Sequence, residues 1–248
     1  MISAGLFATL LYAPDSPAFH WIPEWLRGLL MGIAMGVTAI AIIYSPGGKH
    51  SGAHINPAVT LTFYRLHKIQ ARDALAYIVA QFIGGLTGVW FIAALLGRVF
   101  TDAPVNYVIT VPGLGGEALA FLIEFLLSFV LMLMILFTSN TRAFSKLTGI
   151  FAGILLSFYI PLAAPISGMS INPARTFASA LPAQMWMGLW LYFVAPPAAM
   201  LLAAEIYLWS TQRTTREICC KLCPNVETPC ISHRCCQVEE KTIGKTDL

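Results

Sequence analysis

Long apolar runs separated by short polar connections make up most of the chain. An α-helix needs roughly 20 residues to cross the hydrocarbon core of a bilayer. Apolar and polar residues do not alternate along these runs, as they do in the strands of a membrane barrel. The pattern therefore predicts an all-α polytopic membrane protein. The candidate spans are Leu26–Tyr44, Ala74–Leu96, Leu119–Phe137, Leu147–Ala164 and Met187–Trp209.

The composition agrees with this pattern. Apolar residues make up 57% of the chain and charged residues only 11%. A soluble protein of this size needs more polar surface, so a soluble bundle of buried helices is disfavoured. No secretory signal precedes the first apolar run, so the spans themselves must direct insertion.

The amino-terminal run, Met1 to Tyr12, is too short to span a bilayer. About 12 residues give only about 18 Å of helix. Either this helix is a half-span, or the true chain begins upstream of Met1. We favour the second interpretation, because an even number of crossings brings both termini to the same side. We therefore expect six spans, the first of them truncated.

Basic residues are concentrated in alternate connections and after the last span. By the positive-inside rule these segments face the cytoplasm, so both termini are expected to be cytoplasmic. The opposite side carries only Arg27 and Arg98, apart from Arg175. The cytoplasmic group is Lys49, Arg65, Lys68, Arg72, Arg142, Lys146, Arg213, Arg216 and Lys221.

The tetrapeptide Ile-Asn-Pro-Ala occurs at residues 55–58 and again at 171–174. Each copy follows a span and a connection that contains Ser and Gly, and a short apolar stretch follows each copy. Asn is a favoured N-cap, and Pro at the first helical position loses no hydrogen bond. Asn56-Pro57-Ala58 and Asn172-Pro173-Ala174 therefore predict the starts of two half-length helices.

The two copies divide the chain into repeats at 1–115 and 116–209, followed by a tail at 210–248. Odd numbers of spans give the repeats opposite orientations, which brings their half-helices together at the midplane. Backbone at that depth must be buried in protein or line a cavity. We expect its unpaired carbonyls and the two Asn amides to line a water-filled path. These carbonyls belong to Gly52, Ala53, His54, Ile55, Gly168, Met169, Ser170 and Ile171.

The sequence resembles the aquaporin, or major intrinsic protein, family and its bacterial-type water and small-solute channels. The similarity covers essentially Met1 to Trp209. The segments that carry it are GAHINPAVT, SINPARTF, Glu124 in FLIEFLLSF, AQFIGG around Gln81, and YFVAPPAAM.

The resemblance implies a right-handed bundle of six spans with two re-entrant half-helices. It also implies a homotetramer in the plasma or inner membrane, with one passive pore per protomer. Glu124 is expected to anchor the second re-entrant loop, and the matching Glu of the first span falls upstream of Met1. We expect no cofactor and no nucleic-acid partner.

Arg175 lies one turn into the second half-helix, where a lipid-facing Arg would be costly. A snorkelling Arg is the alternative, but the resemblance implies the Arg of the pore constriction. Met169 and Ile160 align with the small residue and the His of water-specific members. Met35 aligns with their aromatic residue, with Gly36 as the alternative.

The expected filter is an apolar ring with one cation, and its Met side chains can adapt. We expect water as the main permeant, because Thr176 replaces the Asp that is usual in the glycerol-conducting branch. The alternatives are a channel that prefers glycerol, urea or hydrogen peroxide, and a non-conducting structural protein. His54 is expected to be structural, with a pH gate as the alternative.

All six cysteines fall between Cys219 and Cys236. Disulfides are disfavoured in the cytoplasm, so we expect plain or acylated thiols. A metal or redox site is the alternative, with Cys220, Cys223, Cys230 and His233 as weak zinc candidates.

Two other classes fit the sequence poorly. A secondary transporter needs ion or proton sites, and Glu124 is the only acidic residue well inside a span before Glu205. An intramembrane enzyme needs a nucleophile with a base or a metal cluster in its spans, and no such group of residues is evident.

Overall fold

Five long apolar helices form the body of the computed structural model, which describes residues 1–215, 218–219 and 221–222. They confirm the all-α class and the five full spans. The helix ends lie within three residues of the predicted bounds, on either side, because apolarity marks the hydrocarbon segment and not the helix end. The spans are α3 (Glu24–Tyr44), α6 (Ala71–Leu96), α8 (Gly116–Ser139), α9 (Thr148–Ser167) and α11 (Leu189–Thr211).

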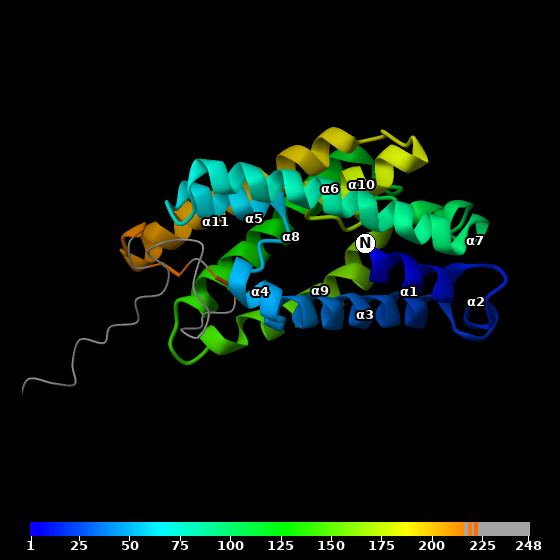
Figure 1. Cartoon of the computed structure of the whole chain (residues 1–248), viewed down its shortest axis with the longest axis horizontal. Helices are drawn as coiled ribbons and strands as arrows, with labels where there is room; N and C mark the ends of the chain where they lie inside the picture. The colour runs from blue at the N-terminus through cyan, green and yellow to red at the C-terminus, as the bar shows by residue number, and fades with distance from the viewer. Residues whose placement is uncertain (216–217, 220, 223–248) are drawn as a thin grey trace, which may run out of the picture.

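The short helix α1 (Ile2–Tyr12) begins near the middle of the bundle's long axis (Figure 1). It packs against α3 and α6 with small side chains, including the buried Ala4 and Ala8. Small connecting helices lie between the spans, and none of them was predicted. They are α2 (Pro17–Trp21), α4 (Pro46–Ser51), α7 (Arg98–Thr101) and two single-turn 3-10 helices, Asn106–Val108 and Ser145–Leu147.

The half-helices are α5 (Pro57–Arg65) and α10 (Pro173–Ala183), and both begin where the repeated motif predicts. Asn56 and Asn172 are the N-caps, and each side-chain oxygen accepts from the N–H two residues later. The fixed φ of Pro at the first position favours a helix start there.

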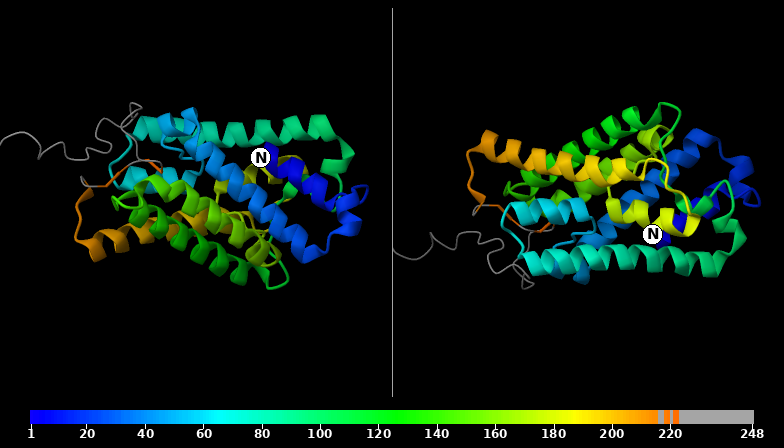
Figure 2. Two further views of the ribbon diagram at one scale, coloured as in Figure 1. Left: turned by 90° about the horizontal axis from the view of Figure 1, so that it is seen from below. Right: turned by 90° about the horizontal axis from the view of Figure 1, so that it is seen from above.

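Helices α3 and α9 cross each other (Figure 2). Glycines lie where they are in closest contact. A Cβ built on Gly32 would lie 2.3 Å from the Ser157 carbonyl oxygen, and one built on Gly36 would lie 2.1 Å from Ser157 Oγ. Small residues at membrane helix contacts let backbones approach in this way.

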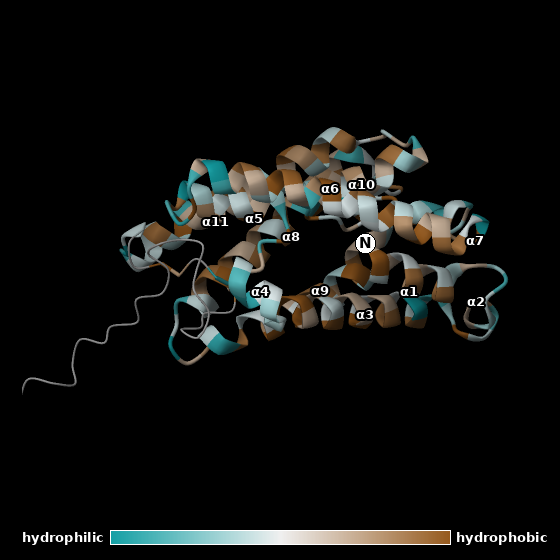
Figure 3. Ribbon diagram, in the orientation of Figure 1, coloured by the Kyte–Doolittle hydropathy of each residue, from teal (hydrophilic) through white to brown (hydrophobic). Residues whose placement is uncertain are grey.

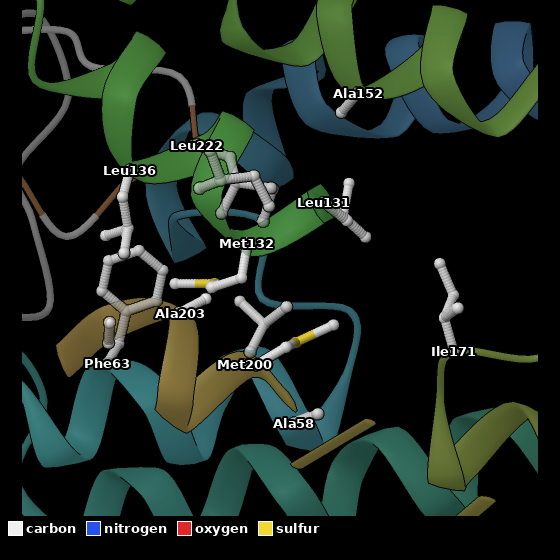
Figure 4. Packing of buried hydrophobic residues seen from close by; sticks show 14 of the residues in the cluster. Ala58, Phe63, Leu131, Met132, Leu136, Ala152, Ile171, Met200, Ala203 and Leu222 are labelled. Carbon is white, nitrogen blue, oxygen red and sulfur yellow. The ribbon is translucent and has the colours of Figure 1, made fainter. Parts of the chain in front are cut away.

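The main core lies where α5, α8 and α11 meet. Figure 4 shows Phe63 of α5, Met132 of α8 and Met200 of α11 gathered there, and all three are fully buried. By contrast, apolar residues cover the outer faces of the spans, and hydrophilic residues lie mainly near their ends (Figure 3). This distribution suits a protein surrounded by lipid.

Part of the tail packs onto this core. Ile218 and Leu222 are buried in it, and Leu222 N–H donates to the Gly52 carbonyl over 3.2 Å. Cys219 is disulfide-bonded, so the expectation of a free or acylated thiol is wrong for this residue. The zinc candidates Cys220, Cys223, Cys230 and His233 lie outside the described residues.

Candidate functional site

The two re-entrant loops begin with the same turn. Ser51 Oγ accepts from Ala53 N–H over 3.3 Å, and Ser167 Oγ accepts from Met169 N–H over 3.2 Å. The glycine inside each turn has a left-handed φ, 79° in the first loop and 75° in the second. Glycine is the residue that adopts this conformation without steric cost. The sequence repeat is therefore also a repeat of backbone shape.

The two loops are joined by a crossed pair of hydrogen bonds. Asn56 Nδ2 donates to the Ile171 carbonyl over 2.7 Å, and Asn172 Nδ2 donates to the Ile55 carbonyl over 2.9 Å. Each Asn thus caps its own half-helix with its oxygen and binds the opposite loop with its nitrogen. This exchange brings the N-termini of α5 and α10 together inside the bundle.

The expectation that the loop carbonyls lack protein partners is wrong for five of them. Besides the crossed Asn bonds, the Gly52 carbonyl accepts from the tail, and the Ala53 carbonyl accepts from Ile55 N–H over 2.9 Å. The His54 carbonyl accepts from Gln81 Nε2 of α6. Sequence could not anticipate these bonds, because every donor except Ile55 N–H is remote in the chain. A carbonyl oxygen has two lone pairs, so each can still accept a second donor.

Glu124 anchors the second loop, as the resemblance implied. Its side chain is fully buried in α8 and accepts three hydrogen bonds from the loop. Oε1 accepts from Ser167 Oγ and Ser170 N–H, both over 2.8 Å, and Oε2 accepts from Ile171 N–H over 2.6 Å. Tyr192 of α11 adds a bond from its hydroxyl to the Ser167 carbonyl over 2.5 Å.

The first loop is held by neutral groups from α6. Tyr77 Oη donates to the Ser51 carbonyl over 2.8 Å, and Gln81 Nε2 donates to Thr60 Oγ1 over 3.1 Å. The His54 ring is buried and stacks on Phe63 with centroids 4.6 Å apart. Tyr77 meets the same ring edge-on at 5.8 Å. These packed contacts favour the structural role of His54 over a gating role.

Arg175 lies in the first turn of α10, and its N–H donates to Asn172 Oδ1 over 3.3 Å. Its Nη1 is buried and has no hydrogen-bond partner among the residues that the structure describes. Met169 is buried at the left-handed position after Gly168. Half-buried Ile160 packs against both larger core clusters.

Met35 and Gly36, the two candidates for one filter position, have different surroundings. Gly36 is in tight contact with α9, where a Cβ would lie 2.4 Å from the Gly153 carbonyl oxygen. Met35 is half-buried and packs against the same cluster as Ile160. This arrangement favours Met35.

The sequence profile of the family described as Major intrinsic protein matches residues 4–207. The chain belongs to this family. A probable NIP-type aquaporin from Nicotiana alata is 35% identical over 75% of this chain and 68% of its own. The probable aquaporin AqpM of Archaeoglobus fulgidus is 36% identical over 77% of this chain and 78% of its own. A glycerol uptake facilitator protein-like 6 from Lactiplantibacillus plantarum is 34% identical over 71% of this chain and 82% of its own.

A solved structure has the same fold. The aquaglyceroporin of Plasmodium falciparum superposes with a TM-score of 0.65 over 83% of this chain and 89% of its own, at 18% identity. The matches span 64% to 68% of the first four plant relatives.

Several residues that hold the loops of this major intrinsic protein were not among the predicted site residues. Tyr192 lies in YFVAPPAAM and Gln81 in AQFIGG, so both were within segments that carry the resemblance. Thr110 lies in an irregular connection between α6 and α8 and donates to Thr176 over 3.0 Å. No local pattern in that connection could have identified it.

Proposed function

We propose that this major intrinsic protein is a passive channel that conducts water first and small uncharged solutes second. The observation that carries the proposal is the crossed pair of bonds between Asn56 and Ile171 and between Asn172 and Ile55. It brings two helix N-termini together, and their positive ends repel cations and protons. Each Asn amide has two N–H groups, and the crossed bond uses one of them. The other is assigned to the permeant.

The proposed filter consists of Met35, Ile160, Met169 and Arg175. The buried Nη1 of Arg175 supplies the donor, and the other three residues give an apolar wall. Such a ring accepts a molecule that has an oxygen acceptor and carries no charge. The proposed acceptors along the path are the loop carbonyls of the two repeats, residues 1–115 and 116–209.

Stopped-flow light scattering of proteoliposomes, with water and glycerol as permeants, tests this proposal. Ile160→His adds a polar group to the apolar wall. The glycerol-to-water permeability ratio should therefore fall roughly fivefold, which corresponds to the net free energy of about one hydrogen bond. Ile160→Val is the matched control and should keep the ratio. An unchanged ratio in Ile160→His would remove Ile160 from the filter, and liposomes with no flux at all would favour a structural role.

The assembly and orientation belong to the same proposal. We assign the chain to a homotetramer in the plasma or inner membrane, with the connections rich in Lys and Arg on the cytoplasmic side. Light scattering coupled to size exclusion measures the number of protomers. Protease access to the tail in sealed right-side-out vesicles tests the orientation, and cleavage there would contradict it.

A further inference from the structure

Three buried hydroxyl groups form a chain beside the second half-helix. Thr110 Oγ1 donates to Thr176 Oγ1 over 3.0 Å, and Thr176 Oγ1 is hydrogen-bonded to Ser170 Oγ. Ser170 Oγ then donates to the carbonyl of Asn172 over 3.0 Å. Thr110, Thr176 and Ser170 are at most 5% exposed.

The direction of this chain follows from the number of protons. Each hydroxyl has one proton to donate. Ser170 gives its proton to the Asn172 carbonyl, so the bond between Ser170 and Thr176 must use the proton of Thr176. Thr176 can then only accept from Thr110. The chain therefore starts at Thr110 and ends on Asn172, the N-cap of α10, and bonds aligned in one direction strengthen one another.

Thr110 is held against the end of α9 and the start of the second loop by backbone contacts. Gly113 N–H donates to the Ile166 carbonyl in the last turn of α9 over 2.9 Å. A Cβ on Gly168 would lie 2.9 Å from Val111 N and 3.0 Å from Thr110 Cα. The connection between α6 and α8 thus lies directly on the loop that carries Met169 and leads to Arg175.

In the first repeat, the equivalent threonine has a different hydrogen-bond donor. Thr60 follows Asn56 by as many residues as Thr176 follows Asn172, and its hydroxyl accepts from Gln81 Nε2 over 3.1 Å. Gln81 belongs to the spanning helix α6, whereas Thr110 belongs to a connection between spans. The half-helix that carries Arg175 is therefore contacted at this position by a connection, in addition to Glu124 of the spanning helix α8, which holds its loop.

We propose that Thr110 is a positioning residue for solute selectivity. Its hydroxyl fixes Thr176 and, through Ser170, the N-cap Asn172, and so sets the place of the intervening Arg175. Loss of the Thr110 donor leaves a buried acceptor unpaired and frees the first turn of α10 to shift. This inference rests on the proposed assignment of Arg175 to the filter.

The test compares Thr110→Val with Thr110→Ser in proteoliposomes. Val keeps the shape and removes the donor, whereas Ser keeps the donor. The glycerol-to-water permeability ratio per folded channel should change roughly fivefold in Thr110→Val, the effect of one lost hydrogen bond, and should return toward wild type in Thr110→Ser. A general loss of packing lowers both permeabilities together and leaves the ratio unchanged.

The matched control is Thr87→Val, because within the described part of the chain the hydroxyl of Thr87 bonds only its own helix, at the Ile83 carbonyl over 2.7 Å. If Thr110→Val does not fold, Thr110→Ala removes the same donor with less bulk. Arg175→Val is measured in the same assay. If it changes the glycerol-to-water permeability ratio while the folded Thr110→Val or Thr110→Ala variant keeps the wild-type ratio, the positioning role is overturned. An unchanged ratio in Arg175→Val refutes the proposed filter itself.

Discussion

The substitution Glu124→Gln tests whether a carboxylate is needed to hold the second re-entrant loop. Glu124 presents two acceptor oxygens to Ser167 Oγ, Ser170 N–H and Ile171 N–H. A Gln amide has one oxygen and one NH2 group. Whichever way the amide is turned, its NH2 faces a backbone N–H at one of the two oxygen positions. The variant therefore loses at least one charge-assisted bond and leaves one buried donor unpaired.

The magnitude follows from these two losses. A hydrogen bond to a charged group contributes about 1.5–3 kcal/mol, and an unsatisfied buried donor costs about 1–3 kcal/mol. The two overlap in part, so we expect a loss of about 3 kcal/mol in the free energy of unfolding. For a chain of this size that corresponds to a fall in Tm of roughly 6–12 °C.

Thermal unfolding of the detergent-solubilised protein, followed by tryptophan fluorescence, measures this change. Glu117→Gln is the matched control, because exposed Glu117 on the same helix accepts from Trp190 Nε1 over 2.7 Å and a Gln oxygen can still accept it. Its Tm should move by less than about 2 °C. A wild-type Tm and wild-type water permeability in Glu124→Gln would refute the anchoring role.

Three further predictions follow from contacts elsewhere. Asn56→Asp keeps the helix cap but places a carboxylate against the Ile171 carbonyl, so water permeability per folded channel should fall roughly tenfold in stopped-flow measurements. Gly36→Ala should lower the yield of folded protein because its Cβ would lie 2.1 Å from Ser157 Oγ. Gly84→Ala should not, because no described residue outside its own helical turn lies within 4 Å of the added Cβ. Arg65→Ala breaks a half-exposed 2.8 Å ion pair and should change stability by less than about 1 kcal/mol in thermal unfolding.

The parts of the structure that sequence predicted are those fixed by local chemistry. The five full spans follow from apolar length, and the starts of α5 and α10 follow from the capping preference of Asn and the fixed φ of Pro. The family and the fold class were confirmed. The passive channel stays a proposal. The assignment of Met35, Ile160, Met169 and Arg175 to a filter stays a prediction.

What sequence did not predict depends on contacts between distant segments. The loop carbonyls are paired by Asn56, Asn172, Gln81 and the tail, and only the three-dimensional arrangement brings most of these donors within reach. Thr110 lies in an irregular connection, where neither helical nor strand periodicity marks a buried position. Ile218 and Leu222 are similar, because a Cys-rich tail gives no sign that two of its residues will enter the core.

The two repeats share a backbone turn and a crossed pair of Asn bonds, but they are not held in the same way. Neutral groups of one spanning helix, Tyr77 and Gln81, hold the first loop. A buried carboxylate on α8 and a hydroxyl chain from a connection hold the second. Bonds to a charged acceptor are shorter and stronger than neutral ones. The loop that leads to Arg175 therefore has the more strongly fixed position, which suits the repeat proposed to select the solute.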